Sequence, residues 1–236
     1  MTSGVPSVSE RAASVLERIA RAERRSGRTA GSVRLVAVSK TQPLDRILQA
    51  RAAGLSVFGE NYVQEASEKV RAVPDAEWHL IGKLQGNKVR RAVSLFSWIQ
   101  TADSAKRLAE ISRCAVEGRK TVPVLIEVNV GAEDSKAGLP PEELRAVVES
   151  SRGLGGLELR GLMAIPPYAE DPEASRPYFA RLRELRDRLA RELPWADLQE
   201  LSMGMSNDFE AAIEEGATIV RVGTAIFGSR AWGGRS

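Results

Sequence analysis

The order of apolar and polar residues predicts a helix followed by a buried strand at the start of the chain. An apolar stripe at helical spacing consists of Val8, Ala12, Val15, Leu16, Ile19 and Ala22. Ser7 and Glu10 have the spacing of a capping box at its start, after a loose tail at 1–7. The next apolar run, 33–39, is short and continuous, as in a strand of a parallel sheet that is buried on both faces.

Helix and strand patterns then alternate along the rest of the chain. The expected helices are 43–53, 61–72, 86–94, 103–117, 141–151, 172–192 and 207–215, and the expected further strands are 56–59, 77–81, 95–100, 122–129, 157–164, 198–202 and 218–222. Eight strands separated by helices predict a parallel sheet, and eight is the number that closes into a barrel. A doubly wound open sheet is the alternative, but its dinucleotide-binding form needs a Gly-x-Gly-x-x-Gly turn that does not follow the first strand.

We therefore expect an α/β protein with a single (β/α)8 TIM barrel domain at 8–230, an extra N-terminal helix, and flexible tails at 1–7 and 231–236. Hydrophobic residues make up 43% of the 236 positions, enough for a sizeable core. The 34 basic and 31 acidic residues are interspersed, so the chain lacks the basic cluster of a nucleic-acid interface. No apolar run is long enough to span a membrane, and the N-terminus does not resemble a signal peptide.

The numbers of cysteines and histidines limit the disulfide bonds and metal sites that the chain can form. The single cysteine, Cys114, excludes an internal disulfide and fits the reducing environment of the cytoplasm, which is the compartment we expect. One cysteine and one histidine also argue against a zinc site, so we expect no metal.

Polar residues gather where the predicted strands end, which is where barrel enzymes keep their chemistry. Lys40 follows the first strand directly and is a candidate amine for imine formation, although most lysines in such places are solvated charges. Asn61 follows the second strand. His79 lies within the third strand between Trp78 and Leu80, and fits a hydrogen-bonded residue of the core or pocket wall better than a general base.

The loops after the seventh and eighth strands have the residues of a phosphate site. Ser206 precedes a helix, and Gly223 and Thr224 offer backbone amides and a hydroxyl. Ser206 would also serve as an ordinary helix N-cap. Once the barrel closes, both loops adjoin Lys40, and an amine beside an anion site suggests pyridoxal 5'-phosphate (PLP) as the cofactor.

PLP also needs a partner for its ring nitrogen, and Arg221 is the candidate because it lies two residues before Gly223. A salt bridge at the barrel rim would explain this arginine as well. A guanidinium stays charged and can only donate hydrogen bonds, so opposite the ring nitrogen it would leave that nitrogen unprotonated and weaken the ring as an electron sink.

Six blocks of sequence run in order from about residue 35 to 230: VAVSKTQP, FGENYVQE, WHLIGKLQGNK, EVNVGAEDSKAG, GLMAIPP and LSMGMSNDFEAAIEEGATIVRVGTAIFG. Together they resemble the YggS/PROSC family of pyridoxal phosphate homeostasis proteins. The resemblance implies a barrel similar to the N-terminal domain of alanine racemase, with the cofactor held as a covalent aldimine on Lys40. It also implies cofactor contacts at Ser206, Gly223 and Thr224 for the phosphate, Arg221 for the ring nitrogen, and Asn61 and His79 in the pocket. The stretch IQTADS at 99–104 departs from the expected Ser-Val-Asp-Ser pattern, so its loop receives no role.

Three functions fit these residues. The first is a PLP-binding protein of intracellular PLP homeostasis that buffers the cofactor or delivers it to PLP-dependent apoenzymes. The second is a PLP-dependent amino-acid racemase or related enzyme, and the third is a barrel enzyme that uses Lys40 directly on a carbonyl substrate. The third explains Lys40 but not the matched blocks.

A racemase needs proton donors on both faces of the α-carbon, and Lys40 can serve only one. None of the tyrosines, Tyr62, Tyr168 and Tyr178, occurs at a predicted strand end, and about a dozen residues after the last strand leave no room for a domain that would supply one. We therefore expect a monomeric PLP-homeostasis protein rather than an enzyme, with residual racemase activity left open. Lys136 is either a solvated loop charge or a second PLP-accepting lysine.

Overall fold

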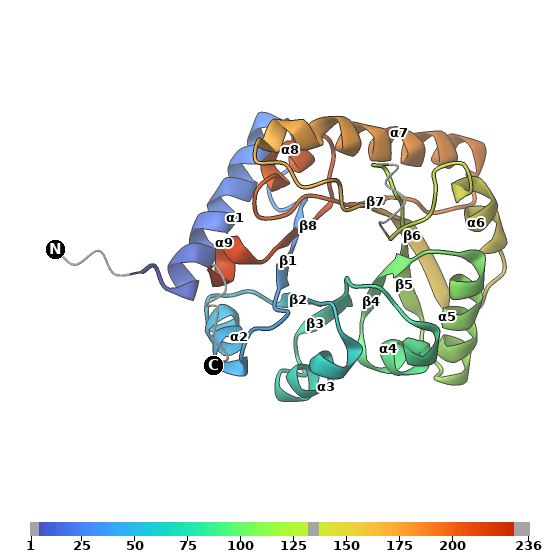
Figure 1. The fold of residues 1–236 in the computed structure, drawn as a ribbon, viewed down its shortest axis with the longest axis horizontal. Helices are drawn as coiled ribbons and strands as arrows, with labels where there is room; N and C mark the ends of the chain where they lie inside the picture. Colours follow the sequence, from blue (N-terminus) through green and yellow to red (C-terminus); the bar gives the residue numbers. More distant parts are fainter. Residues whose placement is uncertain (1–4, 132–136, 229–236) are drawn as a thin grey trace, which may run out of the picture.

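The computed structural model describes residues 5–131 and 137–228, and within them eight parallel strands close into a barrel in sequence order (Figure 1). The strands are β1 (Arg34–Val38), β2 (Val57–Glu60), β3 (Glu77–Leu80), β4 (Trp98–Ala102), β5 (Val122–Glu127), β6 (Leu157–Met163), β7 (Glu200–Ser202) and β8 (Ile219–Val222). The helices are α1 (Val8–Arg25), α2 (Leu44–Ala52), α3 (Val63–Ala72), α4 (Val89–Leu95), α5 (Ala105–Glu117), α6 (Leu144–Ser150), α7 (Arg176–Glu192), α8 (Phe209–Glu214) and α9 (Thr224–Phe227). The predicted TIM barrel with an extra N-terminal helix is confirmed.

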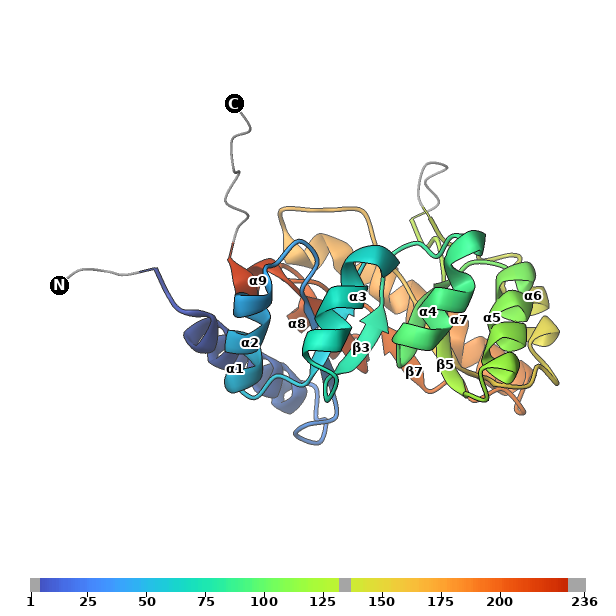
Figure 2. The ribbon, with the colours of Figure 1, turned by 90° about the horizontal axis from the view of Figure 1, so that it is seen from below.

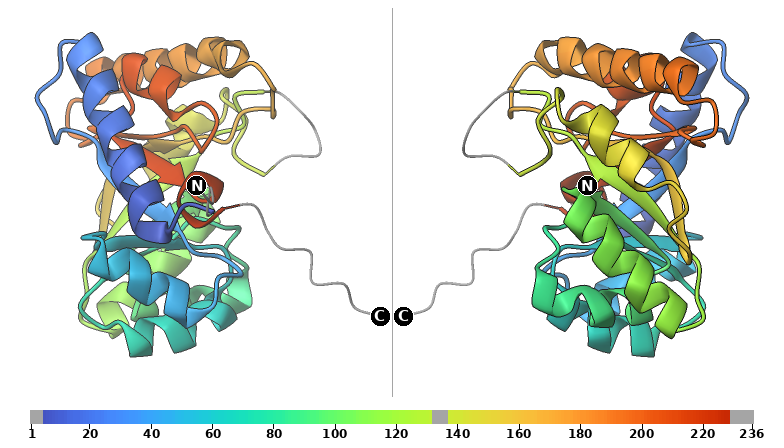
Figure 3. Two further views of the ribbon diagram at one scale, coloured as in Figure 1. Left: turned by 90° about the vertical axis from the view of Figure 1, so that its left-hand side faces the viewer. Right: turned by 90° about the vertical axis from the view of Figure 1, so that its right-hand side faces the viewer.

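The N-terminal helix begins as its sequence predicts. Ser7 Oγ accepts the Glu10 N–H at 3.2 Å, and the Ser7 N–H donates to the Glu10 carboxylate at 2.7 Å, which completes the capping box. The predicted apolar stripe of α1 is buried except at Leu16, which is 42% exposed. α1 lies across the outside of the barrel against α2, α8 and α9 (Figure 3), so it covers the place where the last strand meets the first.

Closure of the barrel sets the neighbours of the first strand. β1 pairs with β8, with Ala37 opposite Val222, and with β2, with Val38 opposite Gly59. The carboxyl end of β1 therefore lies between the carboxyl ends of β2 and β8. Figure 2 shows α9 and the loop that follows β6 at the same end of the barrel, at the top of the view.

The structure has two apolar regions. The larger one lies between the barrel and the helices and includes Phe58, Trp78 and Phe179. The smaller one consists of Val36, Trp98, Leu125, Met163 and Ile219, with Val57 packed against it. Fully buried polar residues of β3, β4 and β7, namely His79, Gln100 and Ser202, hydrogen-bond to one another across the barrel interior. The interior of the barrel is therefore partly polar.

The predicted element boundaries agree with the structure to within about three residues, with a few instructive differences. The helices predicted from 86 and 172 begin with short 3-10 turns, Gly86–Lys88 and Pro172–Ser175. The short helix α9 was not predicted, because four residues carry no periodic pattern. The predicted tail at 231–236 lies outside the described residues, as does Lys136. None of the described helices is long and apolar enough to cross a membrane.

Candidate functional site

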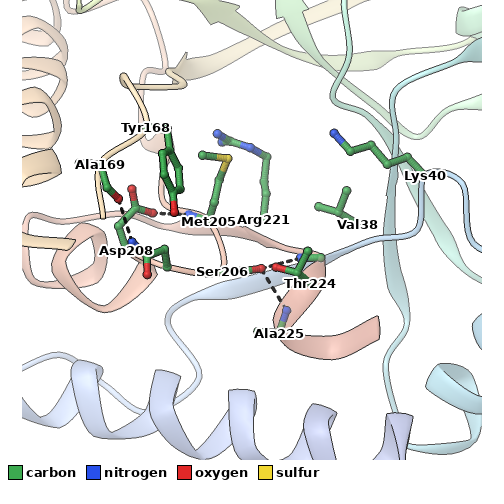
Figure 4. Close-up of a pocket in the computed structure, with 12 residues that line it drawn as sticks. Val38, Lys40, Tyr168, Ala169, Met205, Ser206, Asp208, Arg221, Thr224 and Ala225 are labelled. Atoms are coloured by element: carbon green, nitrogen blue, oxygen red, sulfur yellow. Dashed lines mark hydrogen bonds between the residues drawn. The ribbon is translucent and has the colours of Figure 1, made fainter. Parts of the chain in front are cut away.

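A cavity of about 610 Å3 opens where β1, β7 and β8 end (Figure 4). Five of the seven predicted cofactor contacts line it: Lys40, Ser206, Arg221, Gly223 and Thr224. The remaining lining residues are Val38, Tyr168, Ala169, Met205, Asn207, Asp208 and Ala225. The volume is in the range of pockets that enclose small ligands. Residues far apart in sequence thus converge at the end of the barrel where the sequence predicted them.

A buried ion pair holds the residue that precedes Lys40. Lys69 Nζ donates to the Ser39 carbonyl oxygen at 2.7 Å and to Glu60 Oε1 at 2.8 Å, and Ser39 Oγ donates to the same Glu60 oxygen at 2.6 Å. Burial raises the pKa of the fully buried Glu60, while the hydrogen bonds from Lys69 and Ser39 oppose that rise. Glu60 Oε2 has no hydrogen-bond partner among the described residues.

A second carboxylate holds the residue that follows Lys40. Glu65 Oε1 accepts the Thr41 N–H at 2.6 Å and a hydrogen bond from Lys69 Nζ at 2.6 Å. Thr41 has a φ of +61°, in the left-handed region that β-branched residues rarely adopt. Such a conformation persists only where its surroundings over-determine it. We call Ser39, Glu60, Glu65 and Lys69 the lysine clamp, because together they fix the turn from which the Lys40 side chain extends.

Ser206 joins the two loops of the predicted phosphate site. Its Oγ accepts the N–H of Gly223 at 3.1 Å and the N–H of Ala225 at 3.2 Å, so its own hydroxyl hydrogen can donate to a ligand. Ser206 is not the N-cap of the following helix, because that position belongs to Asp208. The alternative role that the sequence left open for Ser206 is therefore wrong.

The neighbours of Ser206 fix the shape of the loop after β7. Asp208 Oδ1 accepts the Met205 N–H at 2.7 Å, which closes a tight turn around Ser206. Asn207 Nδ2 donates to the carbonyl oxygens of Ala169 and Glu170, at 3.0 and 3.2 Å, and so ties this loop to the loop after β6. Three loops of the barrel are thereby connected around one cavity.

Arg221 is buried at the cavity, with 3% of its surface exposed. Its guanidinium donates to Ser202 Oγ at 2.6 Å and to the Ala164 carbonyl oxygen at 2.9 Å, and it forms no salt bridge with a carboxylate of the described residues. The alternative role in a rim salt bridge is therefore wrong. Burial lowers the pKa of Arg221 to about 10, with Glu127 and Asp208 opposing the shift, so the group stays charged at neutral pH.

Figure 4 shows the side chains of Lys40 and Arg221 extending toward the same end of the cavity, while Ser206 and Thr224 are grouped at the other end. An amine and a cationic donor thus lie at one end, and hydroxyl groups with backbone amides lie at the other. This separation suits a ligand with a carbonyl group and an aromatic nitrogen at one end and an anionic group at the other.

The structure does not bring the other two predicted contacts into this cavity. His79 is fully buried in β3, where its ring stacks on Trp98 with ring centres 5.4 Å apart. Asn61 borders a separate cavity with Lys83 and Lys88. The backbone of Asn61 packs so closely on Gly82 that a Cβ there would lie 2.4 Å from the Asn61 carbonyl oxygen.

Tyr168 is the most consequential residue that the sequence reasoning missed. It lines the cavity and is 79% exposed, although it lies five residues beyond the end of β6 at Met163. Tyr168 does not lie at a strand end, as expected, but it reaches the cavity from a loop. The position of the tyrosines therefore no longer argues against a racemase. The signal was available in the block GLMAIPP, which leads from β6 into the loop that carries this tyrosine.

Comparison with solved structures defines the class of barrel. The family described as alanine racemase, N-terminal domain, matches residues 13–231. PipY of Synechococcus elongatus, solved with PLP bound, is 40% identical with a TM-score of 0.80, and the match covers 91% of this chain and 100% of PipY. A D-threonine aldolase from Filomicrobium marinum is only 16% identical but has a TM-score of 0.72 over 92% of this chain and 60% of its own, which shows the shared fold. The chain is thus a barrel of the alanine racemase N-terminal type.

Sequence comparison narrows the class further. A protein named pyridoxal phosphate homeostasis protein from Aquifex aeolicus is 49% identical over 94% of this chain and 97% of its own length. One of the same name from Pseudomonas aeruginosa is 45% identical over 96% of this chain and 97% of its own length. The chain belongs to this family of pyridoxal phosphate homeostasis proteins, which confirms the resemblance carried by the six sequence blocks.

Proposed function

We propose that this chain binds PLP in the cavity between β1, β7 and β8 and serves PLP homeostasis by buffering the cofactor or delivering it to PLP-dependent apoenzymes. The observation that carries the proposal is the convergence of Lys40, Arg221 and Ser206 on one cavity. The names of the relatives and the PLP found in PipY support it. We further propose that the protein acts as a monomer and that it resides in the cytoplasm. The free thiol of its single cysteine, Cys114, supports the cytoplasmic location.

The residues present fit this cofactor. In the proposal the Lys40 amine would condense with the PLP aldehyde with release of water, and the Ser206 hydroxyl with the backbone amide and hydroxyl of Thr224, beside Gly223, would bind the phosphate. Arg221 donates to the ring nitrogen. When bound, PLP supplies a reactive aldehyde and an electron-withdrawing ring. Asn61 stays a predicted pocket residue, and the contribution of His79 is indirect.

Arg221 also supports a protein that carries PLP rather than one that turns substrates over. Its pKa of about 10 leaves the guanidinium charged at neutral pH, and a charged guanidinium can only donate, so it cannot accept a hydrogen bond from a protonated ring nitrogen. The ring nitrogen would therefore remain an unprotonated acceptor. An unprotonated ring withdraws electrons less strongly, so removal of a proton from a bound amino acid would be slow.

Borohydride labelling tests the binding proposal. Purified protein incubated with PLP should become yellow, and reduction followed by peptide mapping should place the cofactor on Lys40. Lys40→Ala should abolish the label and keep the melting temperature within a few degrees, because Lys40 is not part of the core. Lys83→Ala, which changes a lysine of the neighbouring cavity, is the matched control and should label normally. A label that stays in Lys40→Ala and disappears in Lys83→Ala would contradict the proposal.

Proton exchange at the α-carbon tests the absence of efficient catalysis. The PLP-loaded protein with L-alanine in deuterated water should incorporate deuterium far more slowly than about 1 per second, the lower end of usual enzyme turnover. Tyr168→Phe should not change this rate, because in the proposal Tyr168 does not act as a base. Fast exchange with racemisation that is lost in Tyr168→Phe would instead establish the racemase as the function.

A further inference from the structure

A continuous chain of hydrogen bonds crosses the barrel interior from the cavity to the opposite end. Arg221 donates to Ser202 Oγ at 2.6 Å, and Ser202 Oγ donates to Gln100 Oε1 at 2.6 Å. Gln100 Nε2 lies 2.7 Å from His79 Nδ1, and His79 Nε2 lies 2.7 Å from Glu77 Oε1. These five residues come from β8, β7, β4 and β3, and we call them the interior chain.

Chemistry fixes the direction of these hydrogen bonds, starting from the carboxylate. The Glu77 carboxylate can only accept, so His79 Nε2 carries a hydrogen. Burial lowers the pKa of His79 and so favours the neutral ring, whose Nδ1 is then an acceptor. Gln100 must therefore turn its NH2 group toward His79 and its oxygen toward Ser202. In every hydrogen bond of the interior chain the donor is therefore the residue nearer to the Arg221 cation, and the acceptor is the residue nearer to the Glu77 anion.

This arrangement leaves Arg221 little freedom. Ser202, Gln100 and His79 are fully buried, where a polar group without a partner costs free energy. The Ser202 oxygen accepts from Arg221 while its hydrogen is committed to Gln100. A rotation of the guanidinium away from Ser202 would break a charge-assisted hydrogen bond to a fully buried oxygen.

Charged groups at the far end of the barrel affect the protonation of His79 in the interior chain. Glu77 pairs with Arg34 at 3.3 Å, and the Arg34 guanidinium lies 5.0 Å from the centre of the Trp98 ring that stacks on His79. Burial lowers the pKa of His79 and Arg34 adds to this effect, which together outweigh the rise caused by Glu77 and Glu200 and favour the neutral ring. The far end thus holds one tautomer of His79 rather than a charged ring.

We propose that Ser202, Gln100 and His79 are positioning residues that hold the Arg221 guanidinium in the orientation in which it meets the ring of the bound cofactor. The tautomer of His79, fixed by Glu77, sets the direction of the whole interior chain. The role toward the cofactor rests on the proposed function, whereas the chain itself is a property of the protein without ligand. The two parts can therefore be tested separately.

Nitrogen-15 NMR of histidine tests the chain in the unloaded protein, because His79 is the only histidine of the sequence. The spectrum should show a neutral ring with its hydrogen on Nε2 at about pH 8, and the ring should gain a proton only below the ordinary histidine pKa of about 6.5. In Gln100→Glu, a carboxylate replaces the NH2 group opposite Nδ1, so the ring should gain a second proton and its pKa should rise. A wild-type ring with its hydrogen on Nδ1, or one that titrates near the ordinary value of about 6.5, would overturn the interior chain.

Titration with PLP tests the positioning role. Ser202→Ala and Gln100→Leu should each weaken PLP binding roughly tenfold, the effect of about one hydrogen bond to a charged group, and should alter the pH dependence of the absorption of the bound cofactor. Ser112→Ala is the matched control. It removes another nearly buried serine hydroxyl, which donates to the Gly155 carbonyl oxygen at 2.7 Å away from the interior chain, and it should change neither quantity.

Equal affinity and unchanged absorption in both Ser202→Ala and Gln100→Leu would refute the positioning role. If Gln100→Leu does not fold, as judged by circular dichroism, Ser202→Ala decides the question, because it removes only one oxygen. A wild-type protein that fails to bind PLP would refute the proposed function alone, since the histidine spectrum would still report on the interior chain.

Discussion

The two cationic side chains of the cavity are held in opposite ways. Lys40 is positioned through the residues on either side of it, whose backbone groups bond to Lys69 and Glu65. Arg221 is positioned through its own guanidinium, which bonds to Ser202 and Ala164. These contacts match the proposed roles, because a fixed turn presents the Lys40 amine to the cavity, and a donor to a ring nitrogen acts only when it is aimed.

The two arrangements also differ in charge. The lysine clamp joins one buried ammonium to the buried carboxylate of Glu60 and the partly exposed carboxylate of Glu65, and one oxygen of Glu60 has no partner among the described residues. The middle of the interior chain, by contrast, is formed by neutral groups that satisfy one another in a single direction. Removal of one partner from a buried ion pair leaves an uncompensated charge, whereas loss of a neutral bond leaves only an unpaired dipole. Mutations should therefore damage the clamp more than the interior chain.

Lys69→Met should show the largest effect. The substitution removes the cation that neutralises the fully buried Glu60, so we expect the free energy of unfolding to fall by about 3–5 kcal/mol. Lys69 itself is only 7% exposed, so water would not replace the lost contact. Urea unfolding at neutral pH measures the change. PLP binding should weaken as well, because the Ser39 carbonyl oxygen and the Glu65 carboxylate would both lose Lys69 as their donor.

Two controls isolate the ion pair. Lys120→Met removes an exposed lysine that donates to the backbone oxygens of Val93 and Ser94, and should cost less than about 0.5 kcal/mol. The double variant Glu60→Leu/Lys69→Met should be more stable than Lys69→Met, because it no longer buries a lone carboxylate. A double variant less stable than Lys69→Met would show that Glu60 is not an uncompensated charge there.

The contrast also explains what the sequence could reveal. Strand and helix periodicity is local, so the barrel could be predicted from it. Lys40 and Arg221 could be predicted because each lies at or beside the end of an apolar run, and because closure of the barrel brings the first and last strands together. The hydroxyl- and glycine-rich loops after β7 and β8 were visible for the same reason.

The supporting groups could not be predicted, because they depend on contacts across the barrel. Lys69 lies in the last turn of α3, where a basic residue is ordinary, so its sequence position does not distinguish it. Gln100 lies within the stretch 99–104 that received no role, and Glu77 lies at the end of the barrel where no functional residues were expected. The partners of these three residues depend on which side chains point inward and on the register between strands. The local spacing of residues in the sequence predicts neither of these.

His79→Gln should show a smaller, pH-dependent effect. Burial lowers the pKa of His79. Below about pH 6.5, the ordinary pKa of histidine in an unfolded chain, the unfolded protein therefore binds a proton at His79 more readily than the folded protein does. Lowering the pH through that window therefore destabilises the wild type, by up to about 1.4 kcal/mol per pH unit until the folded pKa is reached. Glutamine offers one acceptor and one donor without titrating, so in His79→Gln this slope should disappear.

The pKa of Glu77 is lowered chiefly by its hydrogen bond with His79, so its contribution to stability is lost only as the pH falls below the unfolded carboxyl value of about 4.3. The two windows are separate, and the difference between wild type and His79→Gln in urea unfolding from about pH 7 to about pH 5 reports on His79, because groups such as Glu60 contribute equally to both proteins. Since His79 is the only histidine, no other imidazole contributes to the difference between the two proteins. Parallel curves for wild type and His79→Gln across this range would mean that the folded ring accepts a proton as readily as the unfolded one, and the interior chain would then not fix its tautomer.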